Sequence, residues 1–144
     1  MNIGKDIAAK PSSAYDAGNS FSVSGLYELT KPRLSLLSVF TASLGYLVYD
    51  PFRSDFSVFV CLTIGTALSA AGSAVLNQWM ERKEDALMSR TKDRPIPAKL
   101  VLPGTAFIFG VSLCVLGVFV LWAGINPWAA MFTLVSIAIY LLLY

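Results

Sequence analysis

Two stretches of this chain, residues 56–79 and 101–122, contain no charged side chain at all. A helix needs about 20 mostly apolar residues to cross the hydrocarbon core of a bilayer, and both stretches are long enough. Two further apolar runs occupy 34–49 and 127–144, and the first is short, so we expect its helix to begin near Pro32. Apolar and polar residues do not alternate within the runs, which favours helices over strands. The sequence therefore predicts an all-α integral membrane protein with about four transmembrane helices.

The composition agrees with this class and argues against several functions. Charged residues make up 14% of the chain, against about 25% in soluble domains, and a net charge of +2 is too small to suggest nucleic acid as a partner. Histidine, the commonest general base and transition-metal ligand, does not occur. Cys61 and Cys114 stand far apart inside apolar runs, so we interpret both as small buried hydrophobic residues.

The basic residues are distributed unevenly about the predicted spans. Of the 11 lysines and arginines, only Arg53 lies between the first and second spans. The others precede the first span or lie between the second and third: Lys5, Lys10, Lys31, Arg33, Arg82, Lys83, Arg90, Lys92, Arg94 and Lys99. The positive-inside rule then predicts a cytoplasmic N-terminus and a cytoplasmic loop 80–100. Residues 1–26 are polar and resemble neither a signal nor a transit peptide, which predicts a flexible cytoplasmic tail and favours a bacterial inner membrane.

Three oxygen-bearing side chains follow the second apolar run at steps of four residues: Asn77, Glu81 and Asp85. Each step advances about 40° around a helix and about 6 Å along it, so the three form a stripe on one helical face. Mg²⁺ prefers one or two protein carboxylates and takes its remaining ligands from water and phosphates. We expect the stripe to hold Mg²⁺, and we leave out Glu84 because it lies off the stripe.

Basic residues follow the stripe directly, namely Arg90, Lys92 and Arg94, before Pro95 and Pro97 stop any helix. Guanidinium and ammonium groups bind phosphate oxygens, so carboxylates with metal on one side and cations on the other predict a diphosphate site. The spacing alone also fits a solvated, mixed-charge loop whose role is topological.

The residue types in this segment form a more specific pattern than the four-residue spacing alone. The run Asn77-x-x-x-Glu81-x-x-x-Asp85, followed by Met88-x-Arg90-Thr91-x-x-Arg94-Pro95-Ile96-Pro97, resembles the first acidic motif of the intramembrane aromatic (UbiA-type) prenyltransferase superfamily. Within it the chain is most similar to the protohaem IX farnesyltransferase family. The upstream run Leu29-Thr30-Lys31-Pro32-Arg33-Leu34 is similar to that family's lead-in to its first helix. The similarity covers the chain from about residue 27 to its end.

The resemblance implies a fold, an activity and a set of roles. It implies a bundle of about nine helices in the lipid bilayer, with residues 27–144 as part of the prenyltransferase domain and 77–100 as its cytoplasmic catalytic loop. The implied reaction transfers a farnesyl group from farnesyl diphosphate to haem B, giving haem O, and haem A synthase or terminal-oxidase assembly proteins are the implied partners. The residues that would hold Mg²⁺ and act in catalysis are Asn77, Glu81 and Asp85, and those that would contact the diphosphate are Arg90, Lys92, Arg94, Lys31 and Arg33.

Some features depart from the family pattern and leave alternatives open. Glu81 stands where the family more often has Asp, and no acidic residue follows Asp93, although the family has a second acidic motif. We therefore expect the chain to be the N-terminal portion of a longer enzyme, inactive by itself. The alternatives are another membrane aromatic prenyltransferase, acting in a quinone or chlorophyll pathway, a non-catalytic membrane assembly subunit and, least favoured, a transporter.

Overall fold

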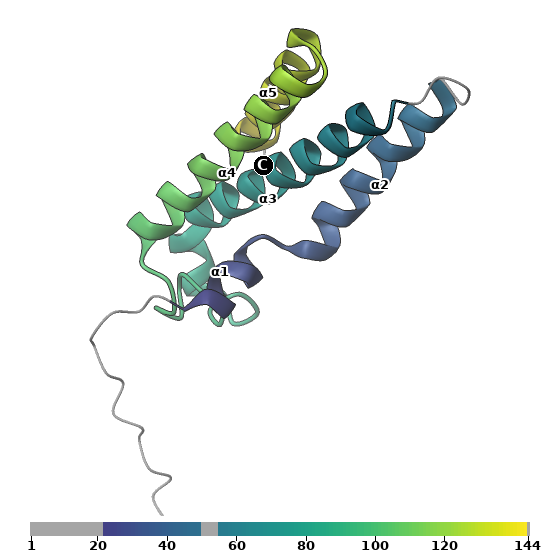
Figure 1. The fold of residues 1–144 in the computed structure, drawn as a ribbon. Coiled ribbons are helices and arrows are strands. Elements are labelled where there is room, and N and C mark those ends of the chain that lie inside the picture. Colours follow the sequence, from purple (N-terminus) through teal and green to yellow (C-terminus); the bar gives the residue numbers. More distant parts are fainter. Residues whose placement is uncertain (1–21, 50–54, 144) are drawn as a thin grey trace, which may run out of the picture.

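The computed structural model describes residues 22–49 and 55–143, which form helices joined by turns, with no β-strand in these ranges (Figure 1). The helices are α1 (Val23–Leu29), α2 (Pro32–Tyr49), α3 (Phe56–Leu87), α4 (Pro103–Gly124) and α5 (Pro127–Leu143). The predictions made for Lys5, Lys10, Arg53 and residues 1–21 fall outside the described residues. The all-α expectation is confirmed.

The described residues of all four predicted spans are helical, apart from Val101 and Leu102, which precede α4. Prolines open α2, α4 and α5, where a missing amide hydrogen costs nothing, and Asp55 caps α3 by accepting a hydrogen bond from the backbone N of Ser57 at 3.0 Å. Residues Phe56–Met80 of α3 and the whole of α4 are long and apolar enough to cross a membrane. The 18 residues of α2 and the 17 of α5 are fewer than the about 20 that a perpendicular crossing needs.

Small residues let α3 and α4 approach each other closely. A Cβ added at Gly72 would lie 2.7 Å from the backbone N of Cys114 and 2.8 Å from the carbonyl O of Gly110. At Gly117 an added Cβ would lie 2.8 Å from the carbonyl O of Gly65. Glycine at these positions brings the two backbones into direct contact, which is how helices associate in lipid.

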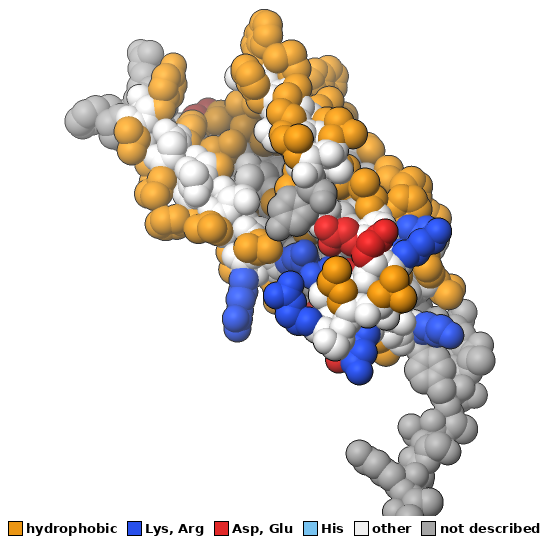
Figure 2. Space-filling view, turned by 180° about the vertical axis from the view of Figure 1, so that it is seen from behind, with side chains coloured by type: hydrophobic (Ala, Val, Ile, Leu, Met, Phe, Trp, Pro, Cys, Tyr) orange, Lys and Arg blue, Asp and Glu red, His pale blue; other side chains and the backbone are white. Residues whose placement is uncertain are grey.

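The charged end of the molecule has a small core of its own. Buried Leu26 and Leu29 of α1 pack with Val75 of α3 and with Ile96 and Val101 of the segment before α4. Figure 2 shows most of the visible Lys, Arg, Asp and Glu side chains gathered at one end, below helices covered by hydrophobic side chains.

The segment 23–26 differs from its sequence-based assignment. It was predicted as part of the flexible tail, whereas the structure places it in α1, which begins after an N-cap at Ser22. The backbone N of Gly25 donates to Ser22 Oγ at 3.2 Å, and α1 packs against α3. A seven-residue helix is too short to show a periodic pattern, so its stability comes from tertiary packing.

Candidate functional site

The acidic stripe is helical throughout, because α3 continues well beyond its apolar part to Leu87. Asn77, Glu81 and Asp85 all line one cavity of about 530 Å³ at the charged end of the molecule. The remaining lining residues are Lys31, Met80, Glu84, Met88, Arg90, Thr91 and Arg94. The cavity thus brings together parts of the junction between α1 and α2, the last turns of α3 and the loop that follows.

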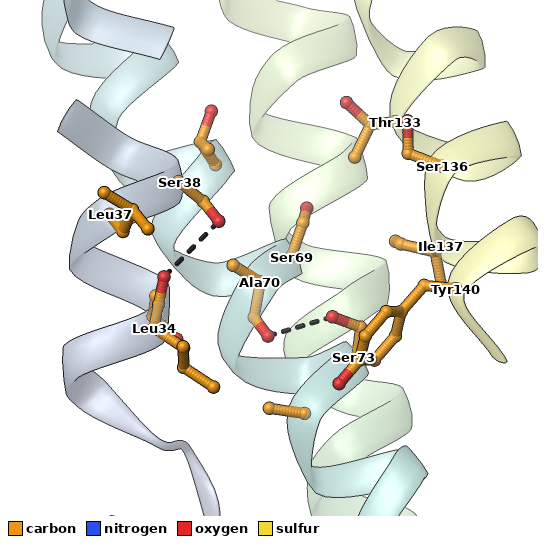
Figure 3. A pocket seen from close by; sticks show the side chains of 13 residues that line it. Leu34, Leu37, Ser38, Ser69, Ala70, Ser73, Thr133, Ser136, Ile137 and Tyr140 are labelled. Atoms are coloured by element: carbon orange, nitrogen blue, oxygen red, sulfur yellow. Dashed lines mark hydrogen bonds between the residues drawn. The ribbon is translucent and has the colours of Figure 1, made fainter. Parts of the chain in front are cut away.

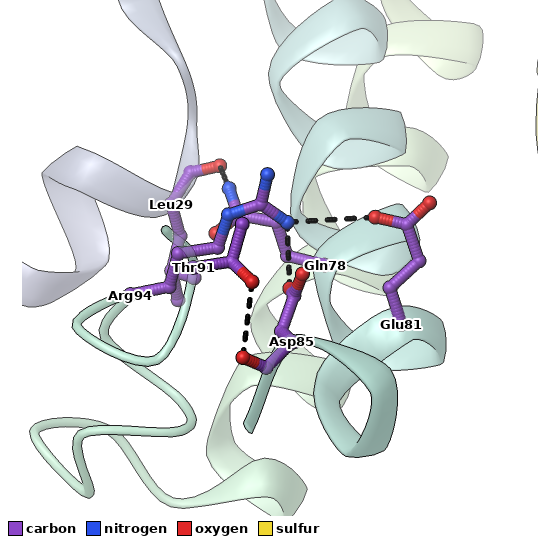
Figure 4. Close-up of polar contacts among 6 residues, drawn as sticks. All are labelled: Leu29, Gln78, Glu81, Asp85, Thr91 and Arg94. Carbon is purple, nitrogen blue, oxygen red and sulfur yellow. Dashed lines mark hydrogen bonds and ion pairs between the residues drawn. The ribbon is translucent and has the colours of Figure 1, made fainter. Parts of the chain in front are cut away.

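Arg94 bridges two members of the stripe. Its Nη1 lies 2.6 Å from Asp85 Oδ2 and 3.5 Å from Glu81 Oε2, so the guanidinium sits between the carboxylates (Figure 4). Asp85 is 5% exposed, whereas the side chains of Arg94 and Glu81 are about one third exposed. The short bond to the buried carboxylate is the stronger contact, because the longer one lies at the limit of hydrogen-bond geometry.

Turns and a buried side-chain contact bring Arg94 back to α3. Backbone hydrogen bonds run from Lys92 N to Met88 O at 3.0 Å and from Arg94 N to Thr91 O at 3.0 Å. The Thr91 hydroxyl donates to the backbone carbonyl of Asp85 at 3.0 Å. Buried Pro95 closes the segment, accepting from two later backbone amides. The loop therefore folds back against the helix it follows, although most of its residues between Met88 and Asp93 are exposed.

Lys31 enters the cavity from the junction between α1 and α2. Its backbone has φ 45°, the left-handed region that residues with a side chain seldom adopt. Burial lowers the pKa of the Lys31 ammonium, the Arg94 guanidinium lowers it further, and the carboxylates of Glu81 and Asp85 act in the opposite direction. The cavity wall thus holds three cations, Lys31, Arg90 and Arg94, and three carboxylates, Glu81, Glu84 and Asp85. A divalent cation bound to the carboxylates would make the net charge of the wall positive and so favour an anion.

Asn77 is 1% exposed, and its Nδ2 has no hydrogen-bond partner among the described residues. Buried amides are normally satisfied, so an unpartnered one at a cavity wall suggests a group that binds there. Within 22–49 and 55–143 no three acidic, cysteine or histidine side chains are close enough to hold a metal by themselves.

The structure brings together most, but not all, of the predicted residues. Lys31, Arg90 and Arg94 line the cavity with the stripe, whereas Arg33 and Lys92 are exposed and do not line it.

Residues that the sequence analysis left out also belong to the cavity wall. Glu84 lines it, although its spacing from Glu81 and Asp85 places it off the stripe. The signal was its seven-residue spacing from Asn77, which returns a helix to within about 20° of the same face. Thr91 also lines the cavity, and no spacing argument pointed to it.

A second cavity, of about 540 Å³, lies between α2, α3 and α5 in the apolar part of the molecule (Figure 3). Its wall mixes apolar side chains with hydroxyl groups, and Figure 3 shows Ser38, Ser69 and Tyr140 around it. On α3 its wall ends at Ala74, one turn before Asn77 begins the wall of the charged cavity. One helix therefore carries an apolar cavity and a charged cavity in succession.

Comparison with known proteins identifies several relatives that share one name. Proteins named protoheme IX farnesyltransferase are similar to the chain: that of Opitutus terrae is 50% identical over 118 residues, covering 79% of the chain and 38% of the relative. That of Solibacter usitatus is 39% identical over 126 residues, with 81% and 43% covered. That of Bartonella henselae is 37% identical over 144 residues, with 97% and 41% covered.

The chain therefore spans about two fifths of the length of these curated relatives. No solved structure matches it significantly. The model of the UbiA prenyltransferase family matches residues 38–144, which include the acidic stripe and most of the residues that line both cavities. This chain is a membrane protein that belongs to the UbiA prenyltransferase family.

Proposed function

We propose that this chain forms the diphosphate-binding part of an enzyme that transfers a farnesyl group from farnesyl diphosphate to haem B, giving haem O. The observation that carries the proposal is the convergence of Asn77, Glu81 and Asp85 with Lys31, Arg90 and Arg94 on one cavity. Similar proteins named protoheme IX farnesyltransferase support this acceptor over a quinone precursor or a chlorophyllide.

The donor set fits Mg²⁺. Glu81 and Asp85 supply two carboxylates on successive turns of α3, and Asn77, one turn before them, would offer its amide oxygen to the metal. The unpartnered Asn77 Nδ2 is a hydrogen-bond donor and would instead bind a diphosphate oxygen. Mg²⁺ takes one or two carboxylates and completes its shell with water and phosphate oxygens, so a third acidic ligand is not needed. When bound, Mg²⁺ would neutralise charge on the diphosphate and make it a better leaving group.

The chain's own residues would bind and orient the substrate. Lys31, Arg90 and Arg94 would donate to diphosphate oxygens, which stabilises the charge that grows there as the carbon–oxygen bond to the farnesyl group breaks. We assign the less direct roles to Arg33 and Lys92, because both lie outside the cavity wall. The apolar cavity beside Ala74 would take the farnesyl chain and keep water from the allylic cation.

The site also bears on location and partners. We propose a bacterial inner membrane, with the N-terminus and loop 80–100 in the cytoplasm, because the charged end of the molecule is rich in Lys and Arg. Within the domain proposed for residues 27–144, segment 77–100 would supply the catalytic groups. Haem A synthase or terminal-oxidase assembly proteins would then receive or use the product.

One observation favours a second candidate, a non-catalytic membrane assembly subunit. Arg94 already forms ion pairs with both carboxylates, as it would in a purely structural network. The two candidates differ in their chemistry, because only the enzyme alters haem.

The test is mass spectrometry of haem from cells that express the gene encoding this chain. The proposal predicts haem heavier by one farnesyl group and one hydroxyl group, dependent on the gene, because water adds to the other vinyl carbon and releases a proton. Unchanged haem alongside a newly prenylated quinone precursor would show that the acceptor is the quinone precursor and not haem B. Unchanged haem with no prenylated product would favour the assembly subunit.

A further inference from the structure

Gln78 makes a long-range contact that the proposed chemistry does not use. It is 3% exposed, and its Nε2 donates to the backbone carbonyl of Leu29 at 3.0 Å, linking α3 to α1 across 49 positions of sequence (Figure 4). Gln78 follows Asn77, so it points about 100° away from the acidic stripe around the helix. It does not line the charged cavity. Gln78 therefore lies beside the stripe without lining the cavity, and its role must lie in the contact with Leu29.

The contact fixes the end of α1. Leu29 is the last residue of that helix and is fully buried, and the last carbonyls of a helix have no partner within it. Gln78 supplies such a partner to Leu29 from α3. A buried carbonyl without a partner is costly, so the bond holds α1 at this place on α3.

Lys31 follows two residues later, in a conformation that needs support. Its φ of 45° is unfavourable for a residue other than glycine, and Pro32 begins α2 immediately afterwards. The junction is held on one side by the bond from Gln78 to Leu29 and on the other by Ser35 Oγ, which donates to the carbonyl of Thr30 at 2.9 Å. Strained backbone persists only where its surroundings enforce it.

The direction of the Lys31 side chain follows from this junction. In the held conformation Lys31 lines the cavity that contains Glu81, Asp85 and Arg94. If α1 moved away from α3, the junction would relax toward ordinary backbone angles and the ammonium would leave the cavity. A small displacement of a binding group is enough to weaken an oriented contact severely.

We infer that Gln78 is a positioning residue, which holds the junction between α1 and α2 so that Lys31 faces the diphosphate. The inference rests on the proposed function and adds to it a residue that does not itself touch the substrate. It predicts that substitutions of Gln78 and Lys31 have non-additive effects on the affinity for the diphosphate.

A double-mutant cycle tests this inference. The dissociation constant of inorganic pyrophosphate with Mg²⁺ is measured by calorimetry on the purified chain in lipid nanodiscs, for Gln78→Met, Lys31→Met and the double variant. We expect Lys31→Met to weaken binding about tenfold, which is typical of a lost charge-assisted bond. Gln78→Met should weaken it by nearly as much, and the double variant no further than Lys31→Met alone.

Thr63→Val provides the matched control. It removes another side-chain hydrogen bond of α3, from Thr63 Oγ1 to the carbonyl of Phe59 at 2.8 Å, but within the helix and away from the cavity. Its pyrophosphate affinity should equal that of the parent. If Gln78→Met does not fold, Gln78→Asn, whose amide is one methylene too short to reach Leu29, replaces it in the cycle.

Three results would overturn the inference while the proposed site stands. The first is an unchanged affinity in a folded Gln78 variant, and the second is a double variant whose loss is the product of the two single losses. An unchanged affinity in Lys31→Met, with Asp85→Asn still impaired, would also overturn it. If the parent bound no pyrophosphate at all, the proposed function would fail, and the inference with it.

Discussion

The two ends of α3 are built in opposite ways. Its apolar part packs on α4 through glycines, so close that a single Cβ at Gly72 has no room. Its charged end is held instead against α1 and the loop after Leu87 by side chains, through the bonds from Gln78 to Leu29 and from Arg94 to Asp85. The apolar part is thus a rigid scaffold, and the charged end is an assembly of segments distant in sequence. If this contrast is correct, substitutions in the two parts should affect different measurements.

The largest effect is expected from Asp85→Asn at the charged end. The change keeps the shape of the side chain but removes the charge that a metal needs, and the partner of Arg94 with it. Haem farnesylation in cells expressing the gene should fall by about 100-fold or more, which is the loss typical of a removed metal ligand or charge partner.

Glu81→Gln should lower farnesylation less than Asp85→Asn, because Glu81 is more exposed and lies farther from Arg94. Both variants should keep the parent's helical circular dichroism. Full activity in both would refute the assignment of the site.

In the apolar part, Gly72→Ala should reduce the free energy of unfolding by about 2 kcal/mol or more, since the added Cβ meets the backbone of α4. The matched control is Gly45→Ala in α2, where an added Cβ meets nothing within 4 Å. That change should be neutral or stabilise by about 0.5–1 kcal/mol. Unfolding by denaturant in detergent measures both, and equal effects would contradict the close packing of α3 on α4.

Arg94→Gln should separate metal binding from diphosphate binding. Without the guanidinium between the carboxylates, Mg²⁺ alone should bind severalfold more tightly, whereas Mg²⁺-pyrophosphate should bind about tenfold more weakly. Calorimetry measures both affinities.

Arg82→Gln is the control for this prediction. Arg82 also lies on α3, but its guanidinium stacks 4.5 Å from the centre of the Trp79 ring and does not line the cavity. The two affinities of this variant should match those of the parent. Arg94→Gln with both affinities unchanged would mean that Arg94 has only a structural role.

The smallest effect is expected from Thr91→Val, which removes the hydroxyl that bonds the backbone carbonyl of Asp85. One buried hydrogen bond contributes about 0.5–1.5 kcal/mol, so amide hydrogen exchange in 88–94 should become faster and pyrophosphate affinity should fall by about threefold at most. Thr41→Val in α2, which loses a bond within its own helix, should leave exchange in that loop unchanged. Identical exchange in both variants would show that the loop is held by other contacts.

The contrast between the two ends also explains what the sequence could predict. The spans can be predicted because an uncharged run is a local feature of the sequence. The stripe can be predicted because helical spacing is also a local feature. The bond from Gln78 to Leu29 joins residues 49 positions apart, and the φ of Lys31 depends on α1, a helix too short to show a pattern. The charges of the acidic and basic side chains predict that these side chains converge on one cavity. The geometry of that cavity could not be predicted, because long-range packing sets it.

The most direct test of the central claim is to titrate inorganic pyrophosphate into the purified chain in lipid nanodiscs, with and without Mg²⁺. The account predicts binding that requires Mg²⁺ and that Asp85→Asn weakens by about 100-fold or more, since the charged end of α3 would hold both metal and diphosphate. Absence of binding, or binding that neither Mg²⁺ nor Asp85→Asn affects, would show that the stripe and its cations are a structural ion-pair network and not a diphosphate site.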